Sequence, residues 1–443
     1  MRPKVCLNMI VKNESRIIRR CLESLRPAID CWVIVDTGST DGTQDLIRQY
    51  LAGIPGELHE RPWVNFGRNR TEAIRLAEGK ADYLLLCDAD MALKIVDPAW
   101  KGSLTAESYL VRQDAGTFSY FNVRLINARS SGRWAYWGAT HEFLGGERPS
   151  VEIAHATTEA IAFDDFGDGG SKREKFERDA RLLQEELDAI ERLERRAATA
   201  PRDADLAVEV EGARHLQRRD VFYLAQTWRD MGELQKSLEA YQRRATMGGW
   251  DEEVWYALFE VAKLSERLGL PAPQVTERYL AAYQNRPRRA EPLVELARFH
   301  RERNELALAH LFALRAINVP KPDDTLFLDT AAYSWRALDE FAVASYWMGE
   351  YKAAARACEW LLENGVLPFE QLARVTDNLN FSRAGMAKAM GQQEGQPGEP
   401  PSPGVLRDGG AATPSVTLSL GGFVPAWNWA GGSDTVAKPD GTK

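Results

Sequence analysis

The chain has 443 residues, 44% of them apolar, and a formal net charge of −8, so it can bury two sizeable cores but shows no clustered basic stretch that would bind nucleic acid. Its apolar runs fall short of the ~18 residues that span a membrane, and its five cysteines show neither paired nor zinc-type spacing. The amino terminus leads directly into an apolar strand rather than a signal sequence. Together these features predict a cytoplasmic protein with no transmembrane segment and no nucleic-acid partner.

The first 90 residues alternate between apolar strands and amphipathic helices. Strands are predicted at residues 4–11, 32–35, 57–60 and 83–86, and the helix before the last strand at residues 66–78. This order is typical of a parallel sheet built by right-handed crossovers. Ligands of such sheets bind beyond the carboxyl ends of the strands, so Asn13, Asp36, Asp88 and Asp90 should face one crevice.

The tetrapeptide Cys87-Asp88-Ala89-Asp90 follows the last of these strands. The desolvation cost excludes two such carboxylates from a buried strand, but at its carboxyl end a hydrated divalent cation can neutralise them. Carboxylate ligands at this spacing suit Mg²⁺ or Mn²⁺ that also binds a diphosphate. An exposed acidic turn would have the same sequence, so the neighbouring motifs must support the interpretation.

Four motifs in this region resemble those of the family 2 glycosyltransferases, whose nucleotide-sugar-binding domain has the GT-A fold. The motifs are Met9-Ile10-Val11-Lys12-Asn13-Glu14, the turn VDTGSTDGT at residues 35–43, Gly67-Arg68-Asn69-Arg70, and Cys87-Asp88-Ala89-Asp90. The resemblance implies an α/β GT-A (Rossmann-like) domain that binds a nucleotide-sugar donor, expected to be a UDP-sugar, with Mn²⁺ or Mg²⁺.

The resemblance also implies roles for single residues. Asp36 would hydrogen-bond the nucleotide base, and Arg68 would lie near the base or the phosphates. Asp88 would contact the ribose or the metal, and Asp90 would be a metal ligand with a catalytic role. The remaining residues that it implies for donor binding are Val11, Asn13, Glu14, Gly38 and Ala89.

Structural alternatives exist for several of these residues. Asp36 could end its strand through an Asx-turn, and Asn13 and Glu14 equally fit a cap of the first helix. Arg68 and Arg70 could be a solvated helix start, although cations at a helix amino terminus oppose the macrodipole and therefore hint at a bound anion.

Beyond Asp90, strands are expected near residues 108–113 and 117–126, followed by the aromatic run Trp134, Tyr136 and Trp137. These rings could stack on a sugar or belong to the core. The His141-Glu142 pair resembles the end of the family's catalytic domain. We predict that Glu142 is the base for the acceptor hydroxyl and that His141 is a metal or diphosphate contact. The competitors for the base are Asp114, Asp164 and Asp165.

The remainder of the chain is predicted to be helical, with self-similar units that resemble tetratricopeptide repeats. The units begin near Tyr223, Trp255, Pro292 and Tyr346, although Arg244 stands where such a repeat has a small residue. The predicted division is a GT-A domain at 1–165, a linker with a long helix at 166–214, a repeat domain at 215–388, and a disordered Gly/Pro-rich tail at 389–443.

The sequence therefore predicts a metal-dependent, inverting hexosyltransferase with a glycan, peptide or small-molecule acceptor. Its repeats would bind the acceptor, a protein partner or a second copy of the chain. The alternative is an inactive nucleotide-sugar domain that serves as a scaffold for the repeats. Two observations favour that alternative. Met91 stands where relatives often have an acidic residue, and the base is not identified.

Overall fold

The computed structural model describes residues 2–116, 118–146, 148–149, 153–168, 172–200 and 203–394. The chain divides into two compact units, Met1–Lys388 and Ala389–Lys443. The predicted disordered tail lies outside the described residues from residue 395 onward. None of the described helices combines the length and apolar character needed to cross a membrane.

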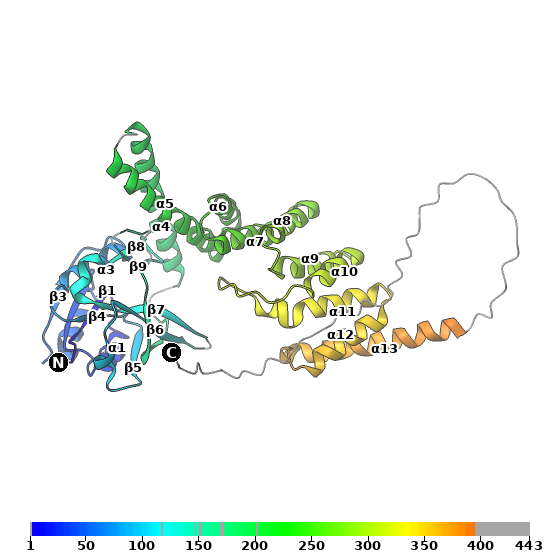
Figure 1. Ribbon diagram of the computed structural model, residues 1–443, viewed down its shortest axis with the longest axis horizontal. Helices are drawn as coiled ribbons and strands as arrows, with labels where there is room; N and C mark the ends of the chain where they lie inside the picture. The colour runs from blue at the N-terminus through cyan, green and yellow to red at the C-terminus, as the bar shows by residue number, and fades with distance from the viewer. Residues whose placement is uncertain are drawn as a thin grey trace, which may run out of the picture. The chain divides into compact units, whose positions relative to one another are not determined.

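An eight-stranded mixed sheet with flanking helices forms the amino-terminal part (Figure 1). Its strand order is β3-β2-β1-β4-β7-β6-β10-β5, and a separate two-stranded sheet pairs β8 with β9. The strands are β1 (Val5–Val11), β2 (Cys31–Asp36), β3 (Gly56–Glu60), β4 (Tyr83–Leu86), β5 (Met91–Ile95), β6 (Ser108–Ala115), β7 (Phe118–Asn127), β8 (Ala135–Trp137), β9 (Phe143–Gly145) and β10 (Ala156–Asp165).

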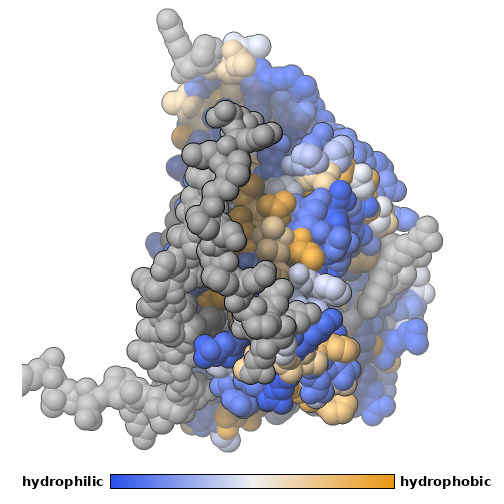
Figure 2. All heavy atoms as spheres, turned by 90° about the vertical axis from the view of Figure 1, so that its right-hand side faces the viewer, coloured by the Kyte–Doolittle hydropathy of each residue, from blue (hydrophilic) through white to orange (hydrophobic). Residues whose placement is uncertain are grey.

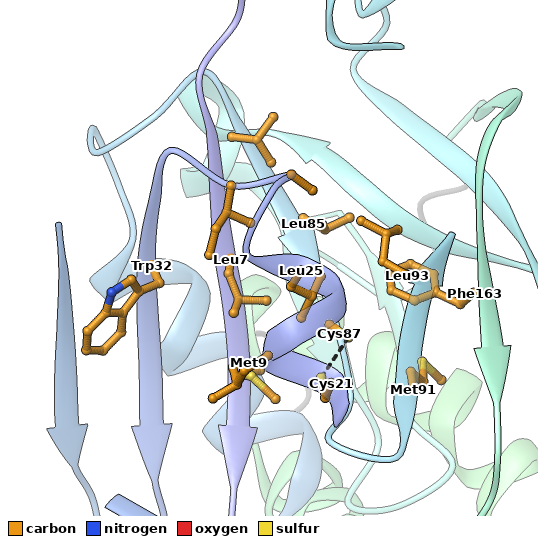
Figure 3. Close-up of a cluster of buried hydrophobic side chains, with 14 of the residues drawn as sticks. Leu7, Met9, Cys21, Leu25, Trp32, Leu85, Cys87, Met91, Leu93 and Phe163 are labelled. Atoms are coloured by element: carbon orange, nitrogen blue, oxygen red, sulfur yellow. Dashed lines mark hydrogen bonds between the residues drawn. The ribbon is translucent and has the colours of Figure 1, made fainter. Parts of the chain in front are cut away.

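The parallel half of the sheet, β3-β2-β1-β4, is the predicted one. Its inner strands are apolar on both faces because helices cover both sides. Helix α1 (Ile18–Leu25) packs on one face beside α2 (Thr43–Tyr50), and α3 (Phe66–Leu76) covers the other. Figure 3 shows the first of these cores, in which the sulfur atoms of the free cysteines Cys21 and Cys87 lie 3.8 Å apart.

The other half of the sheet contains two strands that the sequence analysis did not predict. Strand β5 pairs antiparallel with β10, and β10 pairs parallel with β6. Strand β5 returns along the sheet edge immediately after Asp90, so Met91 lies opposite Asp165. This pairing brings the end of β10 next to the Asp88-Ala89-Asp90 turn.

Helices form the rest of the described chain, and successive helices pack against each other. They are α4 (Lys172–Thr199), α5 (Ala204–Asp230), α6 (Leu234–Thr246), α7 (Asp251–Arg267), α8 (Ala272–Asn285), α9 (Glu291–Glu302), α10 (Leu306–Ala316), α11 (Ala337–Trp347), α12 (Tyr351–Glu363) and α13 (Leu372–Glu394). Short 3₁₀ turns lie at Trp100–Ser103, Ala128–Arg133 and Phe369–Gln371, and a π-helical turn at Ala332–Arg336 precedes α11.

The helix pairs from α5 to α12 repeat the same turn. The first helix of each pair ends in a left-handed residue: Gly232, Gly269, Asn304 and Gly349 have φ between 59° and 83°. Glycine, and asparagine in its place, adopts this conformation readily, and it ends a helix by turning the chain back. An α/β domain followed by helical repeats confirms the predicted fold class.

Two features distinguish these repeats from a regular array. Arg244 is fully buried, and its Nη2 atom lies 2.8 Å from Glu253 Oε2 on α7, which compensates the charge at a position where a small residue was expected. The α10–α11 connection binds to other helices, because Glu252 Oε2 accepts hydrogen bonds from the backbone N–H groups of Thr325 (2.9 Å) and Leu326 (2.7 Å). The chain itself therefore covers part of the repeat surface.

The surface seen from the right-hand side of Figure 1 is mostly hydrophilic, with apolar residues in small groups (Figure 2).

The predicted boundary between residues 214 and 215 falls inside α5. That helix consequently continues from the linker into the first repeat without a break.

Candidate active site

Asp36 ends β2 at the edge of the sheet where ligands of parallel sheets bind. Its Oδ1 atom accepts hydrogen bonds from the backbone N–H groups of Gly38 (2.9 Å) and Ser39 (2.8 Å), which is an Asx-turn. Its Oδ2 atom is buried and has no hydrogen-bond partner within the described residues. A buried acceptor without a partner costs about 1–3 kcal/mol. The structural alternative for Asp36 is thus realised, and one acceptor atom remains for a ligand.

Asn13 and Val11 hold the neighbouring turns together. The Asn13 backbone is left-handed (φ 56°), its N–H donates to Ser39 Oγ at 2.8 Å, and its Oδ1 accepts from the Thr40 N–H at 2.8 Å. The carbonyl of Val11 accepts from the Thr37 N–H at 2.9 Å. Gly38 has φ 105°, which the turn requires. The contacts of Asn13 and Val11 support the turn, and their predicted roles in donor binding stay predictions.

Asp88 lies between two arginines. Arg70 Nη2 contacts Asp88 Oδ1 at 2.5 Å, and Arg124 Nη1 contacts Asp88 Oδ2 at 3.0 Å. Burial alone would raise the pKa of Asp88, but the two guanidinium groups outweigh burial and hold the pKa well below its ordinary value. Both carboxylate oxygens are therefore occupied by protein groups, and direct metal ligation by Asp88 would require these contacts to be released.

The ion pairs extend from Asp88 to Glu142. Arg70 Nε lies 2.7 Å from Glu142 Oε1, and the exposed fractions of these two side chains are 14% and 13%. At the other end, Arg124 Nε donates to Gln113 Oε1. The predicted base and the first aspartate of the motif thus belong to one buried charge network, which joins α3, β7 and the loop before β9.

Asp90 belongs to a second, mainly acidic group. Burial raises its pKa, and the nearby charges of Asp88, Asp165 and Asp168 raise it further. Burial likewise raises the pKa of Glu14, to about 7, with Asp90 as the next cause. Around Asp90 and Glu14, burial and neighbouring carboxylates make negative charge costly, and a bound cation would offset it.

The expected metal site is only partly supported by this arrangement. Asp90 and Glu14 provide oxygen ligands of the type that Mg²⁺ and Mn²⁺ prefer. However, among the described residues no group of three or more His, Cys, Asp or Glu side chains is close enough to hold a metal ion. Asp88, Asp90 and His141 do not come together as one ligand set in this structure.

The loop that carries His141 and Glu142 contacts both the sheet domain and the helices. The Ala139 N–H donates to Glu186 Oε2 on α4 at 2.6 Å, and the Ala139 carbonyl accepts from the Phe66 N–H at 3.0 Å. A Cβ atom at Gly67 would lie 2.4 Å from the Gly138 carbonyl oxygen, so only glycine allows α3 to approach this closely. The glycine that opens the Gly67-Arg68-Asn69-Arg70 motif therefore positions the loop.

The comparisons with known proteins agree with this geometry. The model of glycosyl transferase family 2 matches residues 6–96. These residues form a family 2 glycosyltransferase domain. They contain β1 to β5, and with them Asp36, Arg70, Asp88 and Asp90.

Relatives resemble different parts of the chain. A TPR repeat-containing protein of Synechococcus elongatus is 27% identical over 334 residues, which cover 71% of this chain and 75% of the relative. The lipopolysaccharide core biosynthesis glycosyltransferase LpsC of Rhizobium meliloti is 38% identical over 77 residues, which cover 17% of this chain and 28% of LpsC. The structure of residues 1–349 of S. aureus TarS was solved with UDP-GlcNAc and is 13% identical to this chain. The match covers 61% of this chain and 93% of that structure, with a TM-score of 0.32.

The other residues predicted for the glycosyltransferase site lie at its margins. Arg68 is exposed, and its backbone N–H donates to the helix-capping Asn65 at 2.8 Å. Asp164 forms an ion pair with Lys94, and Asp114 contacts Arg112 at 3.1 Å. Asp165 differs, because it lies near Asp90 and accepts a hydrogen bond from the Tyr120 hydroxyl at 2.6 Å.

The three rings that could stack on a sugar or belong to the core occupy different environments. Trp134 is 2% exposed and belongs to the core beneath α3. The Arg70 guanidinium lies 5.6 Å from the centre of the Tyr136 ring, and Trp137 Nε1 donates to the Gly146 carbonyl at 2.9 Å. Trp134 is thus a core residue, whereas Tyr136 and Trp137 are partly exposed.

Sequence reasoning missed the roles of Arg70 and Arg124. Arg70 was considered as part of a solvated helix start or as a hint of a bound anion, but not as a partner of Asp88 and Glu142, and Arg124 was not considered. A signal was present for Arg124, because it stands between apolar residues in a strand, where a buried guanidinium needs an anionic partner.

Proposed function

We propose that this protein is a metal-dependent glycosyltransferase that moves a sugar from a UDP-sugar to an acceptor hydroxyl with inversion. The observation that carries the proposal is the buried, unpartnered Oδ2 atom of Asp36 at the carboxyl end of β2, within the family 2 domain. The uracil base offers one ring N–H, which can donate a hydrogen bond to this atom once the turn that follows β2 exposes it. The acceptor can be a glycan, a peptide or a small molecule.

Glu142 is the proposed base. In a single displacement, the acceptor oxygen loses its proton to the carboxylate and attacks the anomeric carbon while the bond to the diphosphate breaks on the other side. Glu142 Oε1 lies 2.7 Å from Arg70 Nε, so the other oxygen, Oε2, is the atom proposed to take the proton. A divalent cation held by Asp90, with Glu14 nearby, would offset the charge on the departing diphosphate.

A scaffold without catalysis is the second candidate. The observation that favours it is the pairing of both Asp88 oxygens with arginines, since this leaves the predicted metal set incomplete. In that case the repeats would carry the function and the sheet domain would at most bind a nucleotide.

A measurement of nucleotide binding is the first test, because both proposals allow the sheet domain to bind a nucleotide. A domain that binds no nucleotide would contradict the proposed enzyme. UDP at 100 times its dissociation constant should stabilise the protein by about 2.7 kcal/mol. We expect this stabilisation to require Mn²⁺ and to disappear in Asp36→Asn and Asp90→Ala, but to persist in the control Asp164→Asn, whose carboxylate pairs with Lys94. Release of UDP from UDP-sugars then tests catalysis. Binding without donor hydrolysis or transfer, over a full set of donors, would establish the scaffold.

A further inference from the structure

Helix α5 reaches from the repeats to the loop that carries the proposed base. Arg219 donates two hydrogen bonds to the His141 carbonyl, from Nε at 3.2 Å and from Nη2 at 3.0 Å. The Tyr223 ring stacks on the His141 ring with centroids 4.2 Å apart and planes 6° from parallel. Arg219 and Tyr223 are four residues apart and therefore lie on the same face of the helix.

The guanidinium of Arg219 also contacts two aromatic rings. This group lies 4.8 Å from the centre of the Tyr223 ring and 5.1 Å from that of Phe143, the residue that follows Glu142. At these distances the cation is attracted by the faces of both rings. Glu142 is therefore flanked by two residues, His141 and Phe143, that α5 holds.

The backbone of His141 needs such support. Its φ of 51° lies in the left-handed region, which side-chain-bearing residues rarely adopt. A residue in this conformation persists only when its surroundings fix it, and such residues cluster at functional sites. The surroundings here are Arg219 and Tyr223 on α5, with Glu186 of α4 bonded to the Ala139 N–H.

We propose that Arg219 and Tyr223 are positioning residues for glycosyl transfer. They hold His141 in its left-handed conformation and thereby keep the neighbouring Glu142 carboxylate against Arg70. This role rests on the proposed function. It makes the first repeat helix a structural part of the active site and extends the catalytic unit through the end of α5 at Asp230.

The test compares two substitutions with two controls in the full-length protein. Arg219→Ala and Tyr223→Leu remove the hydrogen bonds and the stacked ring. Tyr223→Phe keeps the ring. Arg218→Ala changes the neighbouring residue, whose Nε atom donates to the Met247 carbonyl at 3.2 Å and not to the loop.

Two measurements are needed. The first is the NMR signal of the His141 ring protons, which the stacked Tyr223 ring shields. The chain has six histidines, so the signal can be assigned by its loss in His141→Gln. The second is kcat and the donor KM for transfer.

Both Arg219→Ala and Tyr223→Leu should move the His141 signal away from its shielded position. They should also lower kcat by about 10²-fold, the effect expected of a misplaced catalytic group, with the donor KM changed less than twofold. Tyr223→Phe and Arg218→Ala should match the wild type in both measurements.

Three results would overturn the positioning role while the wild type remains active. They are an unmoved His141 signal in Tyr223→Leu, a moved signal with unchanged kcat, and an equal loss of kcat in Arg218→Ala. A wild type that binds UDP but transfers no sugar would instead refute the proposed function, and the positioning role with it.

Discussion

Arg70 forms ion pairs with two carboxylates, Asp88 and Glu142, so its replacement tests the charge network directly. In Arg70→Met a flexible apolar chain of similar length takes the place of the guanidinium. Asp88 keeps the contact of its Oδ2 atom with Arg124, whereas Glu142 loses the cation at 2.7 Å from its Oε1 atom. The two carboxylates are 24% and 13% exposed, so water replaces the lost interaction only in part.

The expected cost follows from this difference between the two partners. Removing one partner of a buried ion pair costs about 3–5 kcal/mol, because the remaining charge stays buried without compensation. Since Asp88 retains one arginine, we expect the lower end, about 3 kcal/mol. That is a large share of the 5–15 kcal/mol that stabilises a typical domain.

Urea unfolding measures this loss. With a slope of about 1–3 kcal/mol per M, a loss of 3 kcal/mol lowers the midpoint by about 1–3 M. Adding Glu142→Gln removes the uncompensated charge, so the double variant Arg70→Met/Glu142→Gln should regain part of the stability, with a coupling energy of about 0.5–3 kcal/mol. The exposed Arg68 gives the matched control, because Arg68→Met should stay within about 0.5 kcal/mol of the wild type.

The network would be refuted as a structural element if Arg70→Met were as stable as Arg68→Met. It would also be refuted if the two substitutions at Arg70 and Glu142 were additive, since independent sites show no coupling.

Three further predictions concern Asp90, Glu142 and Asp220. Asp90→Ala should abolish transfer and Mn²⁺-dependent nucleotide binding while the fold stays intact, and retained turnover with the same metal dependence would contradict the assignment. Glu142→Gln should lower kcat by about 10²–10⁴-fold with donor affinity nearly unchanged, whereas full activity would transfer the role to Asp165. Burial, and then Glu186, raise the pKa of Asp220 on α5 well above its ordinary value, so the folded state holds a proton that the unfolded chain releases above about pH 4. Stability should therefore fall as pH rises from there, and the melting temperature of Asp220→Asn should fall less than that of the wild type between pH 5 and pH 8. Parallel curves would show that Asp220 does not carry this dependence.

Hydrophobicity alone predicted the inner strands of the parallel half of the sheet. The inner strands β1, β2 and β4 are apolar on both faces, and glycine-containing or polar turns mark their ends. Strands β5 and β10 were missed for a different reason. Met91–Ile95 does alternate between buried and more exposed residues, but it directly follows an acidic turn, and only pairing with β10, about 70 positions later in the chain, makes it a strand.

The positions of Asp36, Asp88 and Asp90 in the fold were predicted better than the partners of their side chains. The sequence indicates that Asp36, Asp88 and Asp90 stand at strand ends, because motif and strand are adjacent in the chain. It does not indicate that Asp88 pairs with Arg124, since β7 lies beside β4 only through the sheet order. Charge pairing of this kind depends on tertiary contacts, so the predicted set of Asp88, Asp90 and His141 could not be checked before the structure was known.

The same reasoning explains the boundary predicted at residue 215. A repeat pattern can be recognised only where its small and aromatic positions begin, which in α5 is near Tyr223, so the repeat domain was predicted to start at 215 and residues 166–214 were assigned to a linker. Contacts divide the chain differently. The 27 residues of α5 pack against α4 as well as α6, and through Arg219 and Tyr223 the helix reaches His141. A helix that contacts the loop with the proposed base cannot be removed with the repeats without removing those contacts, so a truncation that keeps them must extend through Asp230.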